Sequence, residues 1–439
     1  MKHFAWNDLR DIVTVQGRTW EHEDNLYFNW SSSGFTVRFR GSALLAEFSA
    51  QSSEEYDGIP GDPNTPHRTV WPWISVFVDD NDQPCRTFEL TNKSTKYLIY
   101  SGTDEQEHTV RVVKLTENIK TGLSLHGFDV DGEILMPVVE PIKKRIEFVG
   151  DSITCGFGLG TSEKDRFYYP QEENVWMAHG PTAARYLGMD WQMICISGIC
   201  LAPRKEIPMP VAMNMLYEYT DRPAQQALEL DADHWNFKEH PVDYVVINLG
   251  TNDATAASFS TAPKKIEEQY EKDYVHFLKT VRKCNGDKTK IICALGSMDY
   301  YFYDAMNRAV DTYRAETGDN NVYTFKYCRM SPMDPIGASG HPSELTQQKM
   351  AKELAKHGVT SFCPTSMTLP KERLESIVET IKEFKKESHG GAKVTGINLE
   401  GPFIARGKKG AQNAEYVRGG TIEEFDDLYA KSGKLVKLI

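Results

Sequence analysis

A serine with the surroundings of a nucleophile follows an apolar run in the middle of the chain. Gly150-Asp151-Ser152 comes directly after the run Ile146 to Val149. A serine at the carboxyl end of a parallel strand stands where open α/β sheets bind their ligands. Gly150 permits a tight turn, and the main-chain N–H of Ser152 can face a developing oxyanion. We therefore predict that Ser152 is a nucleophile, although Gly, Asp and Ser are also ordinary turn residues.

Two further apolar runs end in hydrogen-bond donors. Gly198 follows the run Gln192 to Ile196, and Asn252 follows the run Tyr244 to Leu249. Because the carboxyl ends of neighbouring parallel strands converge, the Gly198 N–H and the Asn252 amide would join Ser152 in an oxyanion hole. One such donor contributes about 3 to 4 kcal/mol to transition-state stabilisation. Either residue alone is better explained as a turn or a helix cap.

A histidine near the end of the same segment can serve as the base. His341 lies in Gly340-His341-Pro342-Ser343, just before the helical stretch Glu344 to His357. From that loop it can reach a serine on the first strand and act as general base, then as general acid toward a leaving alcohol. Most of the 12 histidines should be surface or core groups, and His341 is distinguished only because it occurs together with Ser152, Gly198 and Asn252. This chemistry requires no cofactor and no metal.

The elements that must position these residues form an alternating α/β pattern. Nearly continuous apolar runs are typical of strands that are covered on both faces, and an amphipathic helix is predicted at Ile266 to Val281. We predict a three-layer α/β/α domain with a parallel sheet over residues 141–357. Its predicted strands are Ile146 to Val149, Gln192 to Ile196, Tyr244 to Leu249 and Ile291 to Leu295.

The amino-terminal part has a different period. Apolar and polar residues alternate between Asn25 and Asp131, as in half-buried strands, and turn residues separate the runs. We predict an antiparallel β-sandwich of jelly-roll type over residues 1–136, followed by a linker at Pro137 to Pro141. The apolar positions that carry this prediction are Phe35, Val37, Phe39, Ile74, Val76, Val78, Val110, Val112 and Leu115.

Composition excludes several classes of protein. With 439 residues the chain should hold more than one core, because single cores stop growing near about 300 residues. A net charge of -12 argues against sequence-independent nucleic-acid binding, and no apolar run approaches the ~20 residues of a membrane span. The eight cysteines show no zinc-like spacing, and the first residues lack a secretory apolar stretch. We expect a cytoplasmic protein with reduced cysteines.

In this order and spacing, Ser152, Gly198, Asn252 and His341 resemble the four blocks of the SGNH (GDSL) hydrolases. The segment Val149 to Gly158, with the β-rich amino-terminal part that includes His108 to Val113, looks like carbohydrate esterase family 2. The resemblance covers residues 1–357. It implies a jelly-roll domain joined to an SGNH domain, and removal of acetyl groups from xylan, mannan or related sugars through an acetyl-enzyme.

One position departs from the family pattern. SGNH enzymes usually have an aspartate three residues before the histidine, and members of this esterase family often have one two residues before it. Here those positions hold Ala338 and Ser339. Some relatives use a Ser-His dyad whose imidazole is held by a backbone carbonyl, and this is the interpretation we prefer. Asp334 is the nearest upstream carboxylate and the alternative partner of His341.

The tail, residues 358–439, carries a second resemblance. Lys356 to Thr368, Gly396 to Phe403 and Lys408 to Asn413 look like the early part of N-acetylglucosamine-6-phosphate deacetylase. In that family Glu400 would be a metal ligand on a (β/α)8 barrel, and Gln412-Asn413 would approach substrate. One ligand cannot make a catalytic metal site, and the barrel needs about 250 residues. We expect an inactive fragment whose apolar helix face, Leu374 to Phe384, packs on the rest of the chain or on another chain.

Three functions are thus compared. The preferred one is an O-acetyl esterase acting on acetylated oligosaccharides or polysaccharides, without nucleic-acid or membrane partners. A second is metal-dependent N-deacetylation by the tail, favoured by Glu400 and opposed by the missing ligands. A third is a non-catalytic carbohydrate-binding protein, which would have no use for the four candidate catalytic residues. Its stacking platforms would be among Trp20, Trp30, Trp71 and Trp73. The sequence is compatible with a homo-oligomer and does not identify the sugar.

Overall fold

The computed structural model describes residues 1–56, 64–103, 106–138, 141–164, 168–357, 361–362, 364–386, 393–394, 396–405, 407 and 412–438. The chain packs into two compact units, Met1–Ala355 and Lys356–Ile439. The first unit contains both the β-sandwich and the α/β module, which therefore share one packed body. None of the described helices is both long and apolar enough to cross a membrane.

Two antiparallel sheets form the amino-terminal sandwich. In one, β1 (Lys2–Ala5) pairs with β13, and the remaining strands follow the order β11 (Lys96–Ser101), β6 (Ala43–Gln51), β13 (Gly122–Val130), β4 (Asn25–Tyr27) and β3 (Trp20–His22). In the other, β2 (Thr14–Gln16) pairs with β5, within the order β10 (Arg86–Glu89), β9 (Trp73–Val78), β12 (Glu107–Lys114), β5 (Gly34–Arg40) and β14 (Glu133–Leu135). A short hairpin, β7 (Ser53–Tyr56) and β8 (His67–Val70), completes the sandwich.

The alternation seen in the sequence follows the inner face of the second sheet. β9, β12 and β5 are neighbours, and their apolar side chains are buried together in one core. Leu115 differs, because it packs in a core of the α/β module instead. The predicted antiparallel sandwich is confirmed, and the chain just after β12 already contributes Leu115 to the core of the α/β module.

Five parallel strands form the sheet of the α/β module. The order along the sheet is β16 (Asp190–Cys195), β15 (Arg145–Gly150), β17 (Tyr244–Asn248), β18 (Lys290–Leu295) and β19 (Val322–Lys326). The chain passes from β15 to β16 on one side and then returns to β17 on the other, so the winding reverses at β15. Ligands of such sheets bind outside the carboxyl ends of the strands at this reversal. Ser152 follows β15 directly and so lies at that point.

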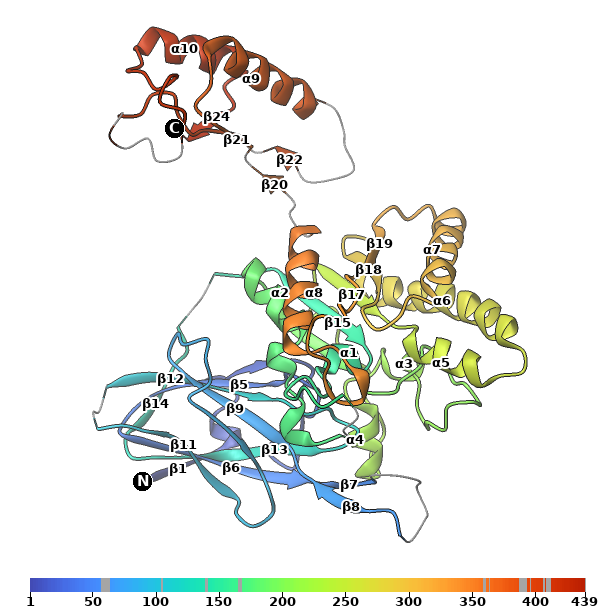
Figure 1. The fold of residues 1–439 in the computed structure, drawn as a ribbon. Helices are drawn as coiled ribbons and strands as arrows, with labels where there is room; N and C mark the ends of the chain where they lie inside the picture. Colours follow the sequence, from blue (N-terminus) through green and yellow to red (C-terminus); the bar gives the residue numbers. More distant parts are fainter. Residues whose placement is uncertain are drawn as a thin grey trace. The chain divides into compact units, whose positions relative to one another are not determined.

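Helices cover both faces of the parallel sheet. α2 (His179–Leu187) and α8 (Glu344–His357) pack on one face, and α6 (Pro263–Asn285) and α7 (Tyr303–Thr317) pack on the other (Figure 1). α6 buries one side, including Tyr270, Tyr274 and Phe277, as its amphipathic pattern predicts. The shorter elements are α1 (Ser152–Cys155), α3 (Met213–Leu216), α4 (Arg222–Ala227), α5 (Thr251–Phe259) and 3-10 turns at Trp6–Asp8, Pro170–Glu172, Val175–Met177 and Ala338–Gly340.

An ion pair joins the sandwich to the first strand of the parallel sheet. Arg18 Nη2 donates to Glu147 Oε1 at 2.9 Å, and both side chains are fully buried. Arg18 Nη1 also donates to the carbonyls of Tyr217 and Tyr219, while the Tyr217 hydroxyl and Gln192 Nε2 donate to Glu147. Hydrogen bonds to the remaining polar atoms of a buried ion pair offset the cost of removing its charges from water. The sandwich therefore neutralises a carboxylate in the middle of β15.

Apolar contacts and buried hydrogen bonds extend this interface. Trp30 lies in the same core as α6 and α7, and its indole Nε1 donates to the Thr220 carbonyl at 2.8 Å. In the opposite direction, Trp191 Nε1 of the α/β module donates to Ser32 Oγ of the sandwich at 2.8 Å. Sandwich and α/β module therefore fold against each other as partners in one core.

The tail unit has its own small core. β21 (Thr365–Ser366), β23 (Ile397–Leu399) and β24 (Val436–Leu438) form a parallel sheet, and β20 (Ser361–Phe362) pairs with β22 (Lys393–Val394). On α9 (Lys371–Lys386), Leu374, Val378 and Ile381 pack with Leu428 of α10 (Ile422–Lys431). These residues find their partners inside the tail, which corrects the expectation that the rest of the chain or another chain covers them. The side chain of Phe384 lies outside the described residues.

Candidate active site

A sharp turn delivers Ser152 to the carboxyl end of β15. Asp151 caps α1 by accepting a hydrogen bond from the Ile153 N–H at 3.0 Å, so the helix begins at the serine. Gly150 approaches this helix closely, because a Cβ there would stand 2.0 Å from Thr154 Oγ1. Ser152 is 8% exposed, and the turn thus fixes its hydroxyl at the sheet edge with little freedom.

His341 completes a hydrogen-bonded pair with the serine. Its Nε2 lies 2.8 Å from Ser152 Oγ, and its Nδ1 lies 3.0 Å from the Ala338 carbonyl oxygen. A carbonyl can only accept, so Nδ1 carries the proton and Nε2 presents its lone pair to the serine hydroxyl. The Phe157 ring packs against the imidazole with a centroid separation of 4.5 Å. This is the protonation state that a general base requires.

The backbone carbonyl thus takes the place of the usual aspartate, as the dyad interpretation predicts. Asp334, the alternative partner, instead accepts a hydrogen bond from Lys349 Nζ at 2.5 Å. The loop that presents the carbonyl is a 3-10 turn at Ala338–Gly340, with Ser339 at φ 51°. What orients His341, which the sequence left open, is in this structure a main-chain group of its own loop.

Burial sets the protonation of the base. It lowers the pKa of His341 to about 4, against which hydrogen bonds to the backbone of Ala338 and Ser339 act in the opposite direction. The imidazole is consequently neutral across the physiological range. Burial also raises the pKa of the neighbouring Asp151 to about 7. Both shifts have the same origin, because the low-dielectric site disfavours whichever form is charged.

Gly198 stands at the end of the strand next to β15. It adopts φ 78°, a conformation that L side chains rarely adopt, whereas a Cβ would meet only Met209 Sδ at 4.0 Å. Backbone conformation rather than lack of space therefore selects glycine here. Among the described residues, no hydrogen bond engages the Gly198 N–H. This N–H can therefore donate to a substrate oxygen.

Asn252 stands at the end of the strand on the other side of β15. Its Nδ2 donates to the Ile199 carbonyl at 3.0 Å, which orients the amide and leaves its second N–H for a ligand. In register, Gly150 faces both Cys195 of β16 and Asn248 of β17, so the three strand ends lie side by side. The structure thus brings Ser152, Gly198, Asn252 and His341 to one edge of the sheet; their catalytic roles remain predictions.

Sequence reasoning missed two groups around this edge. One is Asp253, which accepts from the Leu201 N–H at 2.9 Å and from Arg204 Nε at 2.8 Å, and so ties down the loop after Gly198. The other is Glu117, a sandwich residue whose Oε2 accepts from the Ser197 N–H at 2.6 Å. A charged residue between two predicted strands normally indicates a solvated turn, so the sequence carried no signal for the second.

The residues that would serve the two alternative functions also have defined positions. In the part of the chain that the structure describes, no three His, Cys, Asp or Glu side chains gather where they could hold a metal ion. Glu400 is exposed, and Gln412 accepts a hydrogen bond from the Thr368 N–H at 2.8 Å. Of the tryptophans considered as stacking platforms, Trp20 and Trp30 are buried, whereas Trp71 and Trp73 are half-buried.

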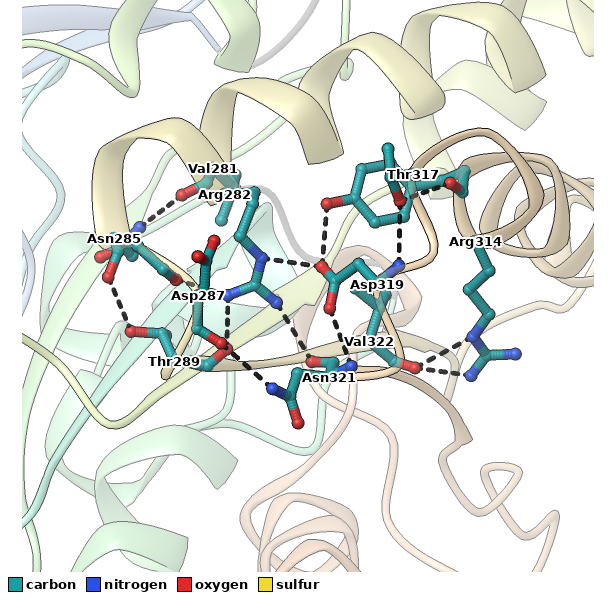
Figure 2. Close-up of polar contacts among 12 residues, drawn as sticks. Val281, Arg282, Asn285, Asp287, Thr289, Arg314, Thr317, Asp319, Asn321 and Val322 are labelled. Carbon is teal, nitrogen blue, oxygen red and sulfur yellow. Dashed lines mark hydrogen bonds and ion pairs between the residues drawn. The ribbon is translucent and has the colours of Figure 1, made fainter.

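A hollow of about 620 Å³ lies at the opposite ends of the strands, between the end of α6 and the starts of β18 and β19. Figure 2 shows its polar contacts: Arg282 donates to Asp319 at 2.8 Å and to the Thr289 carbonyl at 2.7 Å, and Arg314 donates to the Val322 carbonyl. These cations are already engaged with the protein. The cluster therefore fastens α6 and α7 to the sheet, away from the edge that carries Ser152.

Both parts of the first unit match known families. Residues 15–138 match Carbohydrate esterase 2 N-terminal, and residues 146–354 match GDSL-like Lipase/Acylhydrolase. The second match covers the α/β module, the segment that contains Ser152. Together the two matches give residues 15–354 the architecture of a family 2 carbohydrate esterase.

Individual relatives agree with this assignment. Cellulase/esterase CelE of Acetivibrio thermocellus is 30% identical over 292 residues, which are 64% of this chain and 33% of CelE. An acetylxylan esterase / glucomannan deacetylase of Cellvibrio japonicus is 27% identical over 258 residues, which are 57% of this chain and 69% of the relative. The chain thus spans about a third of the first relative's length.

A solved structure gives the same result. A family two carbohydrate esterase from Clostridium thermocellum, in complex with cellohexaose, is 27% identical and aligns with a TM-score of 0.65. The alignment covers 78% of this chain and 97% of that one.

The tail is similar to a different protein. Human N-acetylglucosamine-6-phosphate deacetylase is 43% identical over 86 residues, which are 20% of this chain and 21% of the human enzyme. The predicted resemblance of the tail is confirmed as a match to a short part of that enzyme.

Proposed function

We propose that this chain is a carbohydrate O-acetyl esterase that uses Ser152 as nucleophile and His341 as base. One observation carries the proposal: the 2.8 Å contact between Ser152 Oγ and His341 Nε2, at the point where three parallel strand ends converge. A serine next to a neutral imidazole is the arrangement that nucleophilic acyl transfer needs. Two candidate oxyanion donors, Gly198 and Asn252, flank it.

In the first half-reaction, Ser152 Oγ attacks the acetyl carbonyl carbon and its proton passes to His341 Nε2. The carbonyl electron pair moves onto oxygen, where the N–H groups of Ser152 and Gly198 and the amide of Asn252 hold the negative charge. When the tetrahedral intermediate collapses, the bond to the sugar oxygen breaks and His341 returns the proton to that oxygen. The products are a free sugar hydroxyl and an acetyl-enzyme.

Water completes the cycle by the same route. It attacks the acetyl carbonyl and loses a proton to His341, and the second tetrahedral intermediate expels Ser152 Oγ, which recovers the proton. Acetate leaves. Throughout, the Ala338 carbonyl keeps Nδ1 protonated and the ring in one orientation, and it gives partial compensation for the positive charge that the imidazole gains.

Acetylated xylan- or mannan-type oligosaccharides are the substrates we propose. The Cellvibrio relative is an acetylxylan esterase / glucomannan deacetylase, and the Clostridium structure holds cellohexaose. A neutral sugar ester also suits a chain with a net charge of -12, which would repel polyanions. The seven described cysteines are unpaired, which supports our proposal of a reducing compartment such as the cytoplasm.

Acetate release from a substrate panel tests this proposal. The panel contains acetylated xylo-oligosaccharides, acetylated manno-oligosaccharides, acetylated monosaccharides and, with zinc added, N-acetylglucosamine 6-phosphate. We expect Ser152-dependent release from O-acetyl sugars and none from the N-acetyl phosphate. Release from the N-acetyl compound alone would assign the activity to the tail instead, and release from neither class would refute the esterase.

A further inference from the structure

The sandwich places a buried carboxylate against the oxyanion side of the site. Glu117 lies in the connection between β12 and β13 and is 0% exposed. Its Oε2 accepts a hydrogen bond from the Ser197 N–H at 2.6 Å. Ser197 immediately precedes Gly198, the candidate oxyanion donor. A residue of one module therefore holds the backbone of the other at the peptide next to the predicted chemistry.

The turn that carries Gly198 has few other restraints at this point. The Ile199 N–H returns to the Ile196 carbonyl at 3.3 Å, and Asn252 holds the Ile199 carbonyl. Between them, Glu117 accepts from the Ser197 N–H, whereas no hydrogen bond among the described residues engages the next amide, that of Gly198. Successive amides in a tight turn are coupled through the backbone between them, so fixing the Ser197 amide restricts the orientation of the Gly198 amide.

The connection that carries Glu117 is itself rigid. Lys114 Nζ and Thr121 Oγ1 both donate to the Glu117 carbonyl, at 3.1 and 3.2 Å, and Lys114 Nζ also donates to the Thr116 carbonyl at 2.6 Å. All four residues are buried. A mobile carboxylate could not position anything, whereas one on a backbone fixed by these bonds can.

The same carboxylate oxygen also faces the helix of the nucleophile. Cys155 Sγ, three residues after Ser152, lies 4.0 Å from Glu117 Oε2. Burial raises the pKa of the Cys155 thiol well above its usual range, so the sulfur keeps its proton and approaches as a weak donor. One oxygen atom thus contacts both α1 and the Gly198 turn, which are the two pieces of backbone that must keep their spacing during acyl transfer.

We propose that Glu117 is a positioning residue of the oxyanion hole, which holds the Ser197 N–H so that the Gly198 N–H is aimed at the developing oxyanion. This inference rests on the proposed esterase function. It gives the sandwich a part in the chemistry, in addition to its contribution to packing. The acceptor oxygen of Glu117, rather than its negative charge, performs the role.

Three variants of the full chain test whether the acceptor oxygen of Glu117 or its negative charge is needed. Glu117→Ala removes the acceptor and should lower kcat about 10- to 100-fold with KM within about 2-fold, since loss of a whole oxyanion donor costs about 100- to 1000-fold. Glu117→Gln retains an oxygen acceptor and should stay within about 3-fold of the original kcat. If the alanine variant does not fold, Glu117→Leu fills the volume without an acceptor and takes its place.

Asn118→Ala is the matched control. Asn118 neighbours Glu117 and makes a buried cross-module hydrogen bond, from Nδ2 to Asp221 Oδ1 at 3.1 Å, and among the described residues no hydrogen bond joins its side chain to the Gly198 turn. It should lower the melting temperature while leaving kcat unchanged. An equal loss of kcat in Asn118→Ala, a Gln variant as impaired as Ala, or an Ala variant with the original kcat would each overturn the proposal.

A measurement that needs no activity distinguishes this inference from the proposed function. Amide hydrogen exchange at Ser197 should accelerate in Glu117→Ala and stay slow in Glu117→Gln and Asn118→Ala. If the unmodified protein hydrolysed no acetyl ester yet showed this pattern, the esterase assignment alone would fail. Unchanged protection of Ser197 in Glu117→Ala would refute the positioning role, whatever the enzyme hydrolyses.

Discussion

The two compact units of this chain differ in how sequence similarity relates to chemistry. The tail is 43% identical to human N-acetylglucosamine-6-phosphate deacetylase, yet it covers only 21% of that enzyme. The first unit is 30% identical to CelE, yet it contains a serine, a histidine and two candidate donors from four separate segments. Local similarity is greatest where the chemistry is incomplete. A site depends on which segments are present together, because its residues come from distant parts of the chain.

The largest expected effect tests whether the first unit holds the activity at all. Ser152→Ala should lower hydrolysis of a nitrophenyl acetate by at least about 10,000-fold, because no other described group at the site can form the acyl-enzyme. Assays and melting curves of the two proteins side by side measure it. If the variant kept full activity with an unchanged melting curve, Ser152 would not be the nucleophile. The activity would then have to be sought in the tail.

A smaller effect tests the convergence of strand ends. Asn252→Ala should lower kcat about 100- to 1000-fold, because it removes one oxyanion donor from a preorganised site. Steady-state kinetics with KM and kcat measured separately would check it. If kcat stayed near the original value, Asn252 would serve only to hold the Ile199 carbonyl.

The pH dependence reports the burial of the base. Since burial lowers the pKa of His341 to about 4, its neutral form is present above that pH, and kcat/KM should fall about tenfold per pH unit only below it. The folded pKa lies below the unfolded value of about 6.5, so this group's contribution to stability is lost as pH falls from about 6.5 to 4. A rate profile and melting curves between pH 3.5 and 8, roughly the span set by these values, test both. If kcat/KM already fell below about pH 6.5, the imidazole would be more exposed to water than it is in the structure.

Asp334→Asn should change kcat by less than about 3-fold, because Asp334 bonds to Lys349 while Ala338 holds the imidazole. An aspartate that orients a catalytic histidine is worth up to about 10,000-fold, so the two outcomes are far apart. Kinetics at constant stability decide between them. A collapse of the rate would identify Asp334 as the third member of a triad.

The smallest effect concerns the tail itself. A chain that ends at His357 keeps α8 and should retain esterase activity within about 2-fold. EDTA should have no effect, because catalytic zinc sites use three protein ligands and Glu400 stands alone among the described residues of the tail. Acetate release by the full and shortened chains, each with and without EDTA, measures this. Loss of release on truncation would make the two units functionally dependent.

Sequence reasoning recovered the elements whose patterns are local. Continuous apolar runs located β15, β16, β17 and β18 to within two residues at each end, because these four strands are buried along most of their length. It missed β19, where exposed Tyr323 and Lys326 alternate with buried Val322 and Phe325 at the edge of the sheet. β16, at the opposite edge of the sheet, is buried from Trp191 to Cys195 and has a continuous run, so the alternating exposure of β19, and not its edge position alone, concealed it.

For the candidate site, the same distinction holds. Ser152, Gly198 and Asn252 follow strands that could be located, so their convergence could be predicted. Glu117 could not, since its role depends on how the sandwich docks on the parallel sheet. Neither could the Ala338 carbonyl be assigned with certainty, because every residue carries a carbonyl and only the fold of the loop selects one.

The ion pair between Arg18 and Glu147 has a consequence for the order of folding. The two residues are 129 positions apart, and the arginine leaves the ribosome first, within a sandwich that can already pair its strands. When β15 follows, burial of its central carboxylate is favourable only together with that guanidinium, since removal of one partner from a buried ion pair costs about 3 to 5 kcal/mol. The sandwich therefore supplies the cation that the carboxylate of β15 needs in order to become buried. A parallel sheet expressed without it would have to complete β15 around an unneutralised charge.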